Sequence, residues 1–428
     1  MVMKAISVYI KEFGRVKDSQ LEVLPFIIFS GKSGSGKSYM ALLCHYFYEI
    51  LTNSTRLSRF FERDEYDYQK LSKNFRNEGT ALEIKKETLE NWLAKDAISY
   101  VGAMIGNTSF NGSIKVGIPD VVPDVLRFRF KEEMTGLVNQ EDVDTILSME
   151  HLSYRVTSTT LAAESPFSFL LRYELIQYLY EDFRRLSRSF VFPPSRGPVL
   201  TESLTPQTGL YLQFLQDLNE LNLMTNLEEN DSEDLLKLFY SILDGDIKRV
   251  DSKYIYQTKT TEIPISAAAA SIREIAPLEL LVKKIDIATA SVLFEEPEAH
   301  LHPLKQRMMA DILSIFAQKG TFMQITTHSD YLIRRLNELV SLNELKKRMQ
   351  DENKFNDFCK EVGILPELSL DIEKLTAYTM ESREDGFTSV KLQELALGKE
   401  IPYRTFSEAI SESMRIQNKL EEALENDC

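Results

Sequence analysis

The sequence predicts an α/β protein built around a mixed or parallel sheet, and two observations support this fold class. Three short apolar runs have the character of strands covered on both faces of a sheet; they are residues 26–30, 291–294 and 321–327. Apolar residues at helical spacing follow the runs, over residues 38–51, 303–316 and 329–345. Strands that alternate with helices along a chain form parallel sheets.

The remaining elements are predicted from residue type and turn chemistry. Strands are expected at 5–10 and 20–24, where they would form a hairpin, and at 124–131, 254–265, 375–380 and 386–390. Helices are expected over 72–93, from an N-cap at Ser232 to 245, over 267–284 with a break or kink at Pro277, and over 405–424.

Composition excludes several classes of protein. The 428 residues include 50 Lys and Arg against 65 Asp and Glu, and the net charge of −15 opposes general binding to nucleic acid or anionic lipid. Cys44, Cys359 and Cys428 are far apart and include no CxxC pair, so we expect no disulfide framework and a reducing, cytoplasmic environment. No 18-residue apolar run and no secretion signal are visible, so no membrane association is expected.

A glycine-rich segment is the strongest chemical signal. Residues 31–38 read GKSGSGKS, a complete GxxxxGK[ST] motif between an apolar strand and a helix, which is the context that a phosphate-binding loop requires. Backbone N–H groups would face the phosphates at the helix N-terminus, Lys37 would reach the β and γ phosphates, and Ser38 would bind Mg²⁺. The candidate nucleotide-binding residues are Gly31, Lys32, Ser33, Gly34, Ser35, Gly36, Lys37, Ser38 and Tyr39.

Two adjacent carboxylates follow the strand at 291–294. Ligands bind at the carboxyl ends of strands in α/β sheets, and Glu295 and Glu296 lie at such an end. One carboxylate could hold Mg²⁺ and the other could orient or deprotonate an attacking water. An acidic stretch after a strand is often only a solvated loop, but the phosphate loop upstream favours the functional interpretation.

A histidine follows the strand at 321–327. A neutral imidazole at His328 could hydrogen-bond a γ-phosphate or the attacking water. The alternative is a neighbour of a helix cap, with Ser329 as the capping residue. The position of His328 in the series of strand ends favours function.

These blocks together resemble the ATPases of the ABC class, in particular the soluble group that includes chromosome-maintenance, RecF-like and overcoming-lysogenization-defect proteins, often described as AAA-family ATPases. The matching segments are the phosphate loop, EEPEAHLHP at 295–303 and TTHSD at 326–330. The resemblance implies ATP and Mg²⁺ as cofactors, Glu295 as the Walker B magnesium residue, Glu296 as the catalytic base and His328 as the switch histidine. It also implies a D-loop at 298–302 across a dimer interface.

The resemblance suggests an ATPase head that is interrupted by a large, mostly helical inserted lobe. Its four parts would be residues 1–55 with the phosphate loop, the insertion at 56–250, residues 251–345 with the Walker B strand and the switch histidine, and residues 346–428 as a β-pair and helix that complete the head.

Two weaker segments also resemble the family. Residues 193–196 read PPSR, and Arg196 could contact phosphate or a neighbouring subunit; the alternative is a surface turn with a solvated arginine. Residues 267–274 lie where the family has its signature, but alanines replace most of its serines and glycine. Ser271 could still supply an N–H or hydroxyl. We therefore expect slow turnover or nucleotide-gated assembly.

Two alternatives, a zinc site and contact with nucleic acid, have weaker support. His300 and His302 could suggest zinc, but no third ligand lies at metal spacing. The basic clusters 184–188 and 346–348 could contact a phosphate backbone, although such runs are usually solvated helix faces.

The first functional hypothesis is an ATPase that forms a homodimer or higher oligomer through nucleotide between its heads and controls a separate effector, such as a nuclease or toxin, in bacterial antiphage defence. A separate effector is expected because the residues after Asp330 contain no DxD cluster of a nuclease, and the chain has no coiled-coil heptads or zinc hook. The alternative is a RecF-like repair ATPase that clamps DNA when ATP is bound. The ATPase subunit of a transporter is disfavoured by the altered signature and the large insertion.

Overall fold

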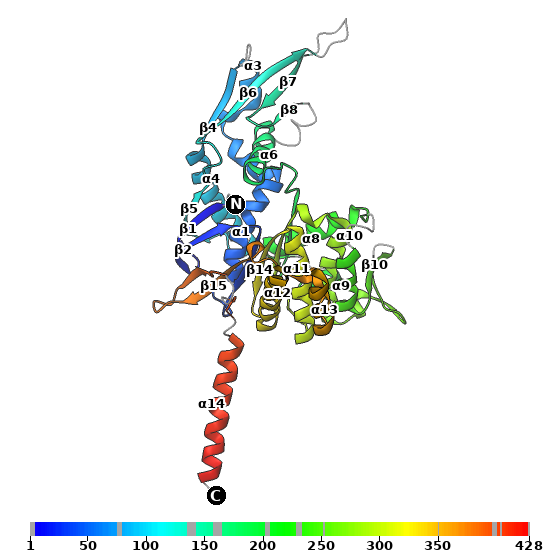
Figure 1. Cartoon of the computed structure of the whole chain (residues 1–428). Coiled ribbons are helices and arrows are strands. Elements are labelled where there is room, and N and C mark those ends of the chain that lie inside the picture. Colours follow the sequence, from blue (N-terminus) through cyan, green and yellow to red (C-terminus); the bar gives the residue numbers. More distant parts are fainter. Residues whose placement is uncertain are drawn as a thin grey trace.

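The structure is a computed structural model of the chain. It describes residues 5–74, 79–134, 143–156, 165–201, 206–227, 233–250, 253–349, 351–395, 400–402 and 405–426. The predicted α/β class is confirmed: a large mixed sheet is surrounded by helices (Figure 1).

Nine strands form the main sheet. In sheet order they are β5 (Gly112–Gly117), β1 (Ile6–Phe13), β2 (Val16–Val23), β16 (Thr388–Leu392), β15 (Thr376–Ser382), β3 (Phe26–Ser30), β14 (Phe322–Thr327), β13 (Ala290–Glu295) and β9 (Arg188–Phe192). Strands β15, β3, β14, β13 and β9 run parallel to one another, whereas β5, β1 and β2 form an antiparallel group. The predicted apolar strands thus lie together in the parallel half, and the predicted hairpin is β1–β2.

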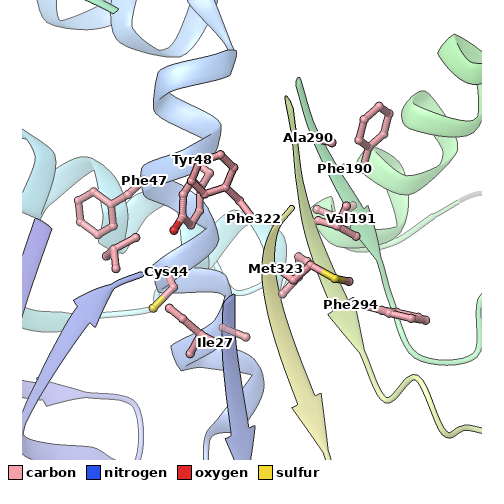
Figure 2. Packing of buried hydrophobic residues seen from close by; sticks show 14 of the residues in the cluster. Ile27, Cys44, Phe47, Tyr48, Phe190, Val191, Ala290, Phe294, Phe322 and Met323 are labelled. Carbon is pink, nitrogen blue, oxygen red and sulfur yellow. The ribbon is translucent and has the colours of Figure 1, made fainter. Parts of the chain in front are cut away.

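Helix α1 (Lys37–Thr52) packs on the parallel strands and forms the centre of the core. Its side chains Cys44 and Tyr48 are buried against the sheet, and Figure 2 shows Cys44 beside Ile27 and Tyr48 beside Phe322. The rings of Tyr48 and Phe322 lie 5.1 Å apart. Because α1 begins where the glycine-rich loop ends, this packing fixes the position of the loop relative to the strand ends.

Two further helices follow the parallel strands as predicted. Helix α11 (Pro303–Lys319) connects β13 to β14, and α12 (Asp330–Met349) follows β14 and packs along α11. Helix α13 (Glu352–Val362) packs on α12, and the short helices η6 (Pro366–Leu368) and η7 (Ile372–Lys374) lead to β15.

Residues 56–250 contain strands as well as helices. The helical elements from the start of this region are α2 (Ser54–Ser58), η1 (Arg59–Phe61), η2 (Asp64–Tyr66), α3 (Tyr68–Asn74), α4 (Lys86–Met104), α6 (Pro166–Tyr180), α7 (Gly197–Thr201), α8 (Gly209–Leu223) and α9 (Glu233–Leu243). A separate antiparallel sheet has the order β4 (Gly79–Lys85), β6 (Val125–Met134), β7 (Val143–Ser148) and β8 (Ser153–Arg155). It lies at the end of the molecule remote from the C-terminal helix (Figure 1).

Within residues 56–250, one predicted element is wrong and another is confirmed. The stretch 72–93 is not one helix, because Gly79–Lys85 forms β4 before α4 begins. Leu82 and Ile84 alternate with polar residues at the two-residue period of a strand, and charge-rich flanks obscured this pattern. The strand expected at 124–131 is β6.

A small three-stranded sheet precedes the return to the main sheet. It contains β10 (Asp246–Val250), β11 (Lys253–Gln257) and β12 (Glu262–Pro264), and η4 (Ile265–Ala267), α10 (Ala270–Lys284) and η5 (Ile287–Thr289) follow. Helix α10 is continuous through Pro277, so of the break or kink expected there, the break does not occur. The predicted N-cap of α9, Ser232, lies outside the described residues.

The C-terminal region divides into two parts. Strands β15 and β16 belong to the main sheet, whereas α14 (Thr405–Asn426) extends away from it (Figure 1). Apolar side chains along α14 are exposed, including Met414, Leu420 and Leu424. Among the described helices, none combines the length and the apolar character that crossing a bilayer requires.

The join between β15 and the N-terminal hairpin is testable. The hydroxyl of the buried Tyr378 accepts the Glu22 backbone N–H at 2.9 Å in a partly buried contact. Tyr378→Phe should therefore lower the free energy of unfolding by about 1 kcal/mol, because this hydrogen bond is lost. Urea unfolding measures the change. Tyr9→Phe, at a side chain that is 47% exposed, is the control and should have little effect; equal losses in both variants would contradict this account.

Candidate functional site

The glycine-rich loop joins β3 to α1 as predicted. Gly31, Gly34 and Gly36 have φ angles of +137°, +71° and +98°, which side chains with a Cβ rarely adopt. A Cβ at Gly31 would lie 3.0 Å from Met380, and one at Gly36 would lie 3.2 Å from Val16. The positive φ angles, and at Gly31 and Gly36 also the close packing, therefore favour glycine at these positions. The loop leads directly into the N-terminus of α1.

The amine of Lys37 occupies the inside of the loop. Its Nζ donates to the carbonyl oxygens of Gly31 at 2.9 Å and Lys32 at 3.0 Å, and lies 3.3 Å from Nδ1 of His328. Burial lowers the pKa of Lys37 to about 8, although the charges of Glu296, Glu298 and Glu295 oppose this shift. A cation held here among backbone groups suits a polyphosphate.

Ser38 and Glu295 meet directly beneath the loop. The Ser38 hydroxyl donates a short hydrogen bond to Oε2 of Glu295, the last residue of β13. Burial raises the pKa of Glu295 to about 7, while the Ser38 hydrogen bond lowers it and the Glu296 charge raises it further. A hydroxyl and a carboxylate are the hard oxygen ligands that Mg²⁺ prefers, and a cation would relieve the cost of burying this carboxylate. These residues therefore fit Mg²⁺.

Glu296 and His328 face each other across the ends of β13 and β14. Oε1 of Glu296 lies 3.4 Å from Nε2 of His328, and their side chains are 40% and 31% exposed. The hydrogen bond from His328 is the largest cause that lowers the pKa of Glu296, while burial opposes it. Glu296 has a left-handed φ of +46°, and its N–H donates to Thr326 at 3.0 Å. Glu296 and His328 are thus partly exposed to solvent, with an ionised carboxylate beside an imidazole. This arrangement is suited to the activation of a water molecule.

Glu298 positions His328 through a hydrogen bond to its backbone. Its Oε1 accepts the His328 backbone N–H at 2.6 Å and the Thr327 hydroxyl at 2.8 Å. Burial raises the pKa of Glu298, and these hydrogen bonds oppose the shift. Sequence reasoning placed Glu298 in the D-loop without this role; its position two residues after Glu296 in EEPE was the available signal.

The other predicted loop residues have different surroundings. Lys32, Ser33 and Gly34 lie at the exposed tip, and the Ser35 hydroxyl is buried without a hydrogen bond to the described residues. The Tyr39 ring packs edge-on against Phe110 at 5.5 Å. The Tyr39 ring also lies against Gly14 in the β1–β2 turn, so it contacts this turn.

The sequence did not single out Arg15. Its Nη1 donates to the carbonyl of Gly34 at 3.2 Å, so the β1–β2 turn reaches the tip of the loop. The turn needs Gly14, because a Cβ there would lie 2.7 Å from the Tyr39 ring. The Phe13-Gly14 pair at the start of the chain was the only signal for this contact.

Both interpretations of Arg196 in the PPSR segment are wrong. It is completely buried, so it is neither a solvated arginine nor positioned to reach phosphate or a neighbouring subunit. Its guanidinium donates to the backbone oxygens of Pro193, Glu274 and Glu295. Burial lowers the pKa of Arg196 to about 10, against the opposing charge of Glu274.

The alternative sites are occupied by structural interactions. His302 caps α11, where its Nδ1 accepts the Leu304 N–H at 3.4 Å, and no group of three or more His, Cys, Asp or Glu residues suited to a metal ion occurs in the described ranges. In the basic clusters, Arg185 donates to the carbonyls of Ala288 and Gly320. Other members form ion pairs, as Arg188 with Glu220 and Lys347 with Asp371.

The segment in the signature position begins α10. Ala267 and Ala269 are exposed, and Ala269 precedes the helix without a side-chain cap. Ser271 lies in the first turn and is half-buried. The first turn of α10 therefore presents backbone N–H groups and small side chains to the surface.

The fold and this site define a P-loop protein that binds nucleotide. A sequence model of the AAA ATPase domain matches residues 3–333, and the chain belongs to this family. The match runs from the N-terminal hairpin through the phosphate loop, the paired carboxylates and His328.

Comparison with solved structures found head domains of chromosome-maintenance proteins. An Smc head bound to the C-terminal winged-helix domain of ScpA is 11% identical, with 93% of this chain and 99% of that chain covered and a TM-score of 0.34. The SMC head of Thermotoga maritima is 8% identical (92% and 100% covered, TM-score 0.33), and an Smc head with an extended coiled coil bound to ScpA from Pyrococcus furiosus is 10% identical (96% and 99%, TM-score 0.34). No curated protein matched. The family assignment rests on the sequence match alone.

Removal of the loop lysine tests the nucleotide site. Lys37→Ala should weaken ATP binding at least thirtyfold, because the site loses the buried cation that faces the phosphates. Isothermal titration calorimetry with ATP and Mg²⁺ measures the affinity. Lys354→Ala, at an exposed lysine on α13, is the control and should change affinity less than threefold; retained affinity in Lys37→Ala would refute the assignment.

Proposed function

We propose that the protein is an ABC-type ATPase that binds ATP with Mg²⁺, hydrolyses it slowly and assembles through its nucleotide sites. The observation that carries the proposal is the contact between Ser38 and Glu295, with Lys37 on one side and the Glu296–His328 pair on the other. Three segments distant in the sequence thus supply the groups that phosphoryl transfer to water requires.

Each side chain has a defined task in this proposal. The N–H groups of the loop and Lys37 bind and orient the β and γ phosphates. Ser38 and Glu295 hold Mg²⁺, which neutralises charge on the phosphates when bound. Glu296 accepts the proton of the attacking water, and His328 orients Glu296 through the contact at 3.4 Å.

Slow turnover follows from the signature segment. In the ABC-class resemblance, the signature of one subunit completes the ATP site of another, so a homodimer or higher oligomer is needed for hydrolysis. Ala267–Ala270 offer no hydroxyl, and Ser271 is the remaining candidate. Binding and assembly would therefore persist longer than in a fast ATPase.

The biological role we propose is control of a separate effector protein, such as a nuclease or toxin, in bacterial antiphage defence within the cytoplasm. Its support is the family-level resemblance and the nucleotide-gated assembly described above. Identification of the protein retained by an ATP-bound variant tests this role.

The catalytic carboxylate provides the main experiment. Glu296→Gln should lower phosphate release at least a hundredfold, a typical contribution of a general base, while ATP affinity stays within threefold. Phosphate release and size-exclusion chromatography with ATP would show loss of turnover and accumulation of an ATP-bound oligomer.

Glu352→Gln, at an exposed position at the start of α13, is the matched control and should behave as the wild type. Unaltered phosphate release in Glu296→Gln would remove Glu296 from the catalytic role.

The signature position gives a second test. Ser271→Ala should slow ATP turnover two- to tenfold with unchanged ATP affinity, because a hydroxyl contributed across a subunit contact acts on the bound γ-phosphate. Steady-state kinetics separate the two parameters. Ser266→Ala, on an exposed residue just before α10, is the control; equal rates in wild type and Ser271→Ala would exclude this serine.

A further inference from the structure

A buried arginine, Arg196, joins α10 to the 193–197 loop through Glu274, which lies one turn into the helix. The Arg196 backbone N–H donates to Oε2 of Glu274 at 2.9 Å, and its side-chain Nε donates to the Glu274 carbonyl at 2.7 Å. Gly197 donates its N–H to Oε1 of the same carboxylate at 3.0 Å. A Cβ at Gly197 would lie 3.0 Å from both Arg273 and Glu274, so the loop and the helix pack closely at this glycine, and a side chain there would require its neighbours to shift.

The same guanidinium also reaches the end of β13. Nη1 of Arg196 donates to the backbone oxygen of Glu295 at 3.1 Å and of Pro193 at 2.9 Å, and the guanidinium lies 4.6 Å from the centre of the Phe294 ring. The Glu295 carbonyl belongs to the peptide bond that leads into Glu296, where the backbone takes its left-handed φ of +46°. Arg196 therefore holds the peptide that aims the Glu296 side chain.

Stability alone is a weak explanation for this arrangement. Burying an ion pair costs desolvation that apolar packing would avoid. Nη2 of Arg196 is buried and makes no hydrogen bond with the residues that the structure describes. Besides its contact within its own loop, at Pro193, the side chain donates hydrogen bonds to two separate elements, α10 at Glu274 and the end of β13 at Glu295.

The other end of this connection is open to a partner. Ala267 and Ala269 are exposed, while Glu274, one turn further along α10, is buried against Arg196. A displacement of the first turn of α10 by a contacting molecule would move Glu274 and its two hydrogen bonds to Arg196, because Glu274 is on the same helix and the loop packs closely on it at Gly197.

We propose that Arg196 is a positioning residue that couples the first turn of α10 to the peptide between Glu295 and Glu296, so that contacts at the start of α10 set the rate of ATP hydrolysis without changing nucleotide affinity. The rate effect rests on the proposed ATPase function. The coupling itself is a property of the protein without nucleotide.

The test uses two variants of the full chain. Arg196→Lys keeps the charge but cannot bridge Glu274 and Glu295 together, and Glu274→Gln keeps the volume but loses the carboxylate that receives two N–H groups. Each should lower kcat at least tenfold with KM for ATP within twofold. Hydrogen exchange should be faster at the amides of 295–299 and unchanged at 31–39.

Arg172→Lys is the matched control. Arg172 is also buried, and it donates to the Thr52 carbonyl at 2.8 Å, away from the loop and the carboxylates. This variant should lose a similar amount of thermal stability but keep kcat and the exchange at 295–299 as in the wild type.

Unchanged kcat and unchanged exchange at 295–299 in folded Arg196→Lys and Glu274→Gln would overturn the proposal. A parallel fall of kcat, ATP affinity and melting temperature, matched by Arg172→Lys, would also overturn it, because it would indicate general loosening. If Arg196→Lys does not fold, Glu274→Gln decides. If the wild type hydrolyses no ATP, the proposed function fails, and hydrogen exchange at 295–299 still decides whether the coupling exists.

Discussion

The site depends on the parallel registration of three neighbouring strands. Ser30 of β3 pairs with Thr327 of β14, and Thr326 pairs with Glu295 of β13, so the three strands end at the same edge of the sheet. Because a parallel ladder fixes which residues end side by side, the glycine loop, the histidine and the paired carboxylates come together without any direct link in sequence. The contact between Ser38 and Glu295 is the consequence that most directly joins the two halves of the chain.

Several charged side chains gather at this edge of the sheet, and they differ in how deeply they are buried. Glu295, Glu296 and Glu298 lie near two buried cations, Lys37 and Arg196, and each carboxylate has a different hydrogen-bonding environment. The pKa of Glu296 is lowered by His328, whereas burial raises those of Glu295 and Glu298. Neighbouring carboxylates with opposite shifts are the usual sign of divided chemical roles. In the proposed mechanism, Glu295 would be the metal ligand, Glu296 the base and Glu298 the residue that positions the histidine.

Much of the nucleotide head could be predicted from the sequence, because its strands are short apolar runs and its loop has fixed glycine spacing. The strand 26–30 and the helix that follows it agree with the structure to within a residue or two. Arg196 could not be predicted, since a proline-rich polar segment usually lies at the surface and burial depends on α10, which is far along the chain. The strand β4 was missed because two apolar residues among charged ones carry little periodic signal. The sequence of α14 also did not show that this helix extends away from the sheet, because the position of a helix depends on its tertiary contacts.

A crystal structure with a non-hydrolysable ATP analogue and Mg²⁺ tests the central claim most directly. We expect phosphates within the loop at 31–37, a metal ion between the Ser38 hydroxyl and Glu295, and Lys37 turned from the carbonyls of Gly31 and Lys32 towards the phosphates. A nucleotide bound elsewhere, or a Ser38–Glu295 hydrogen bond that persists with no metal beside it, would contradict the account.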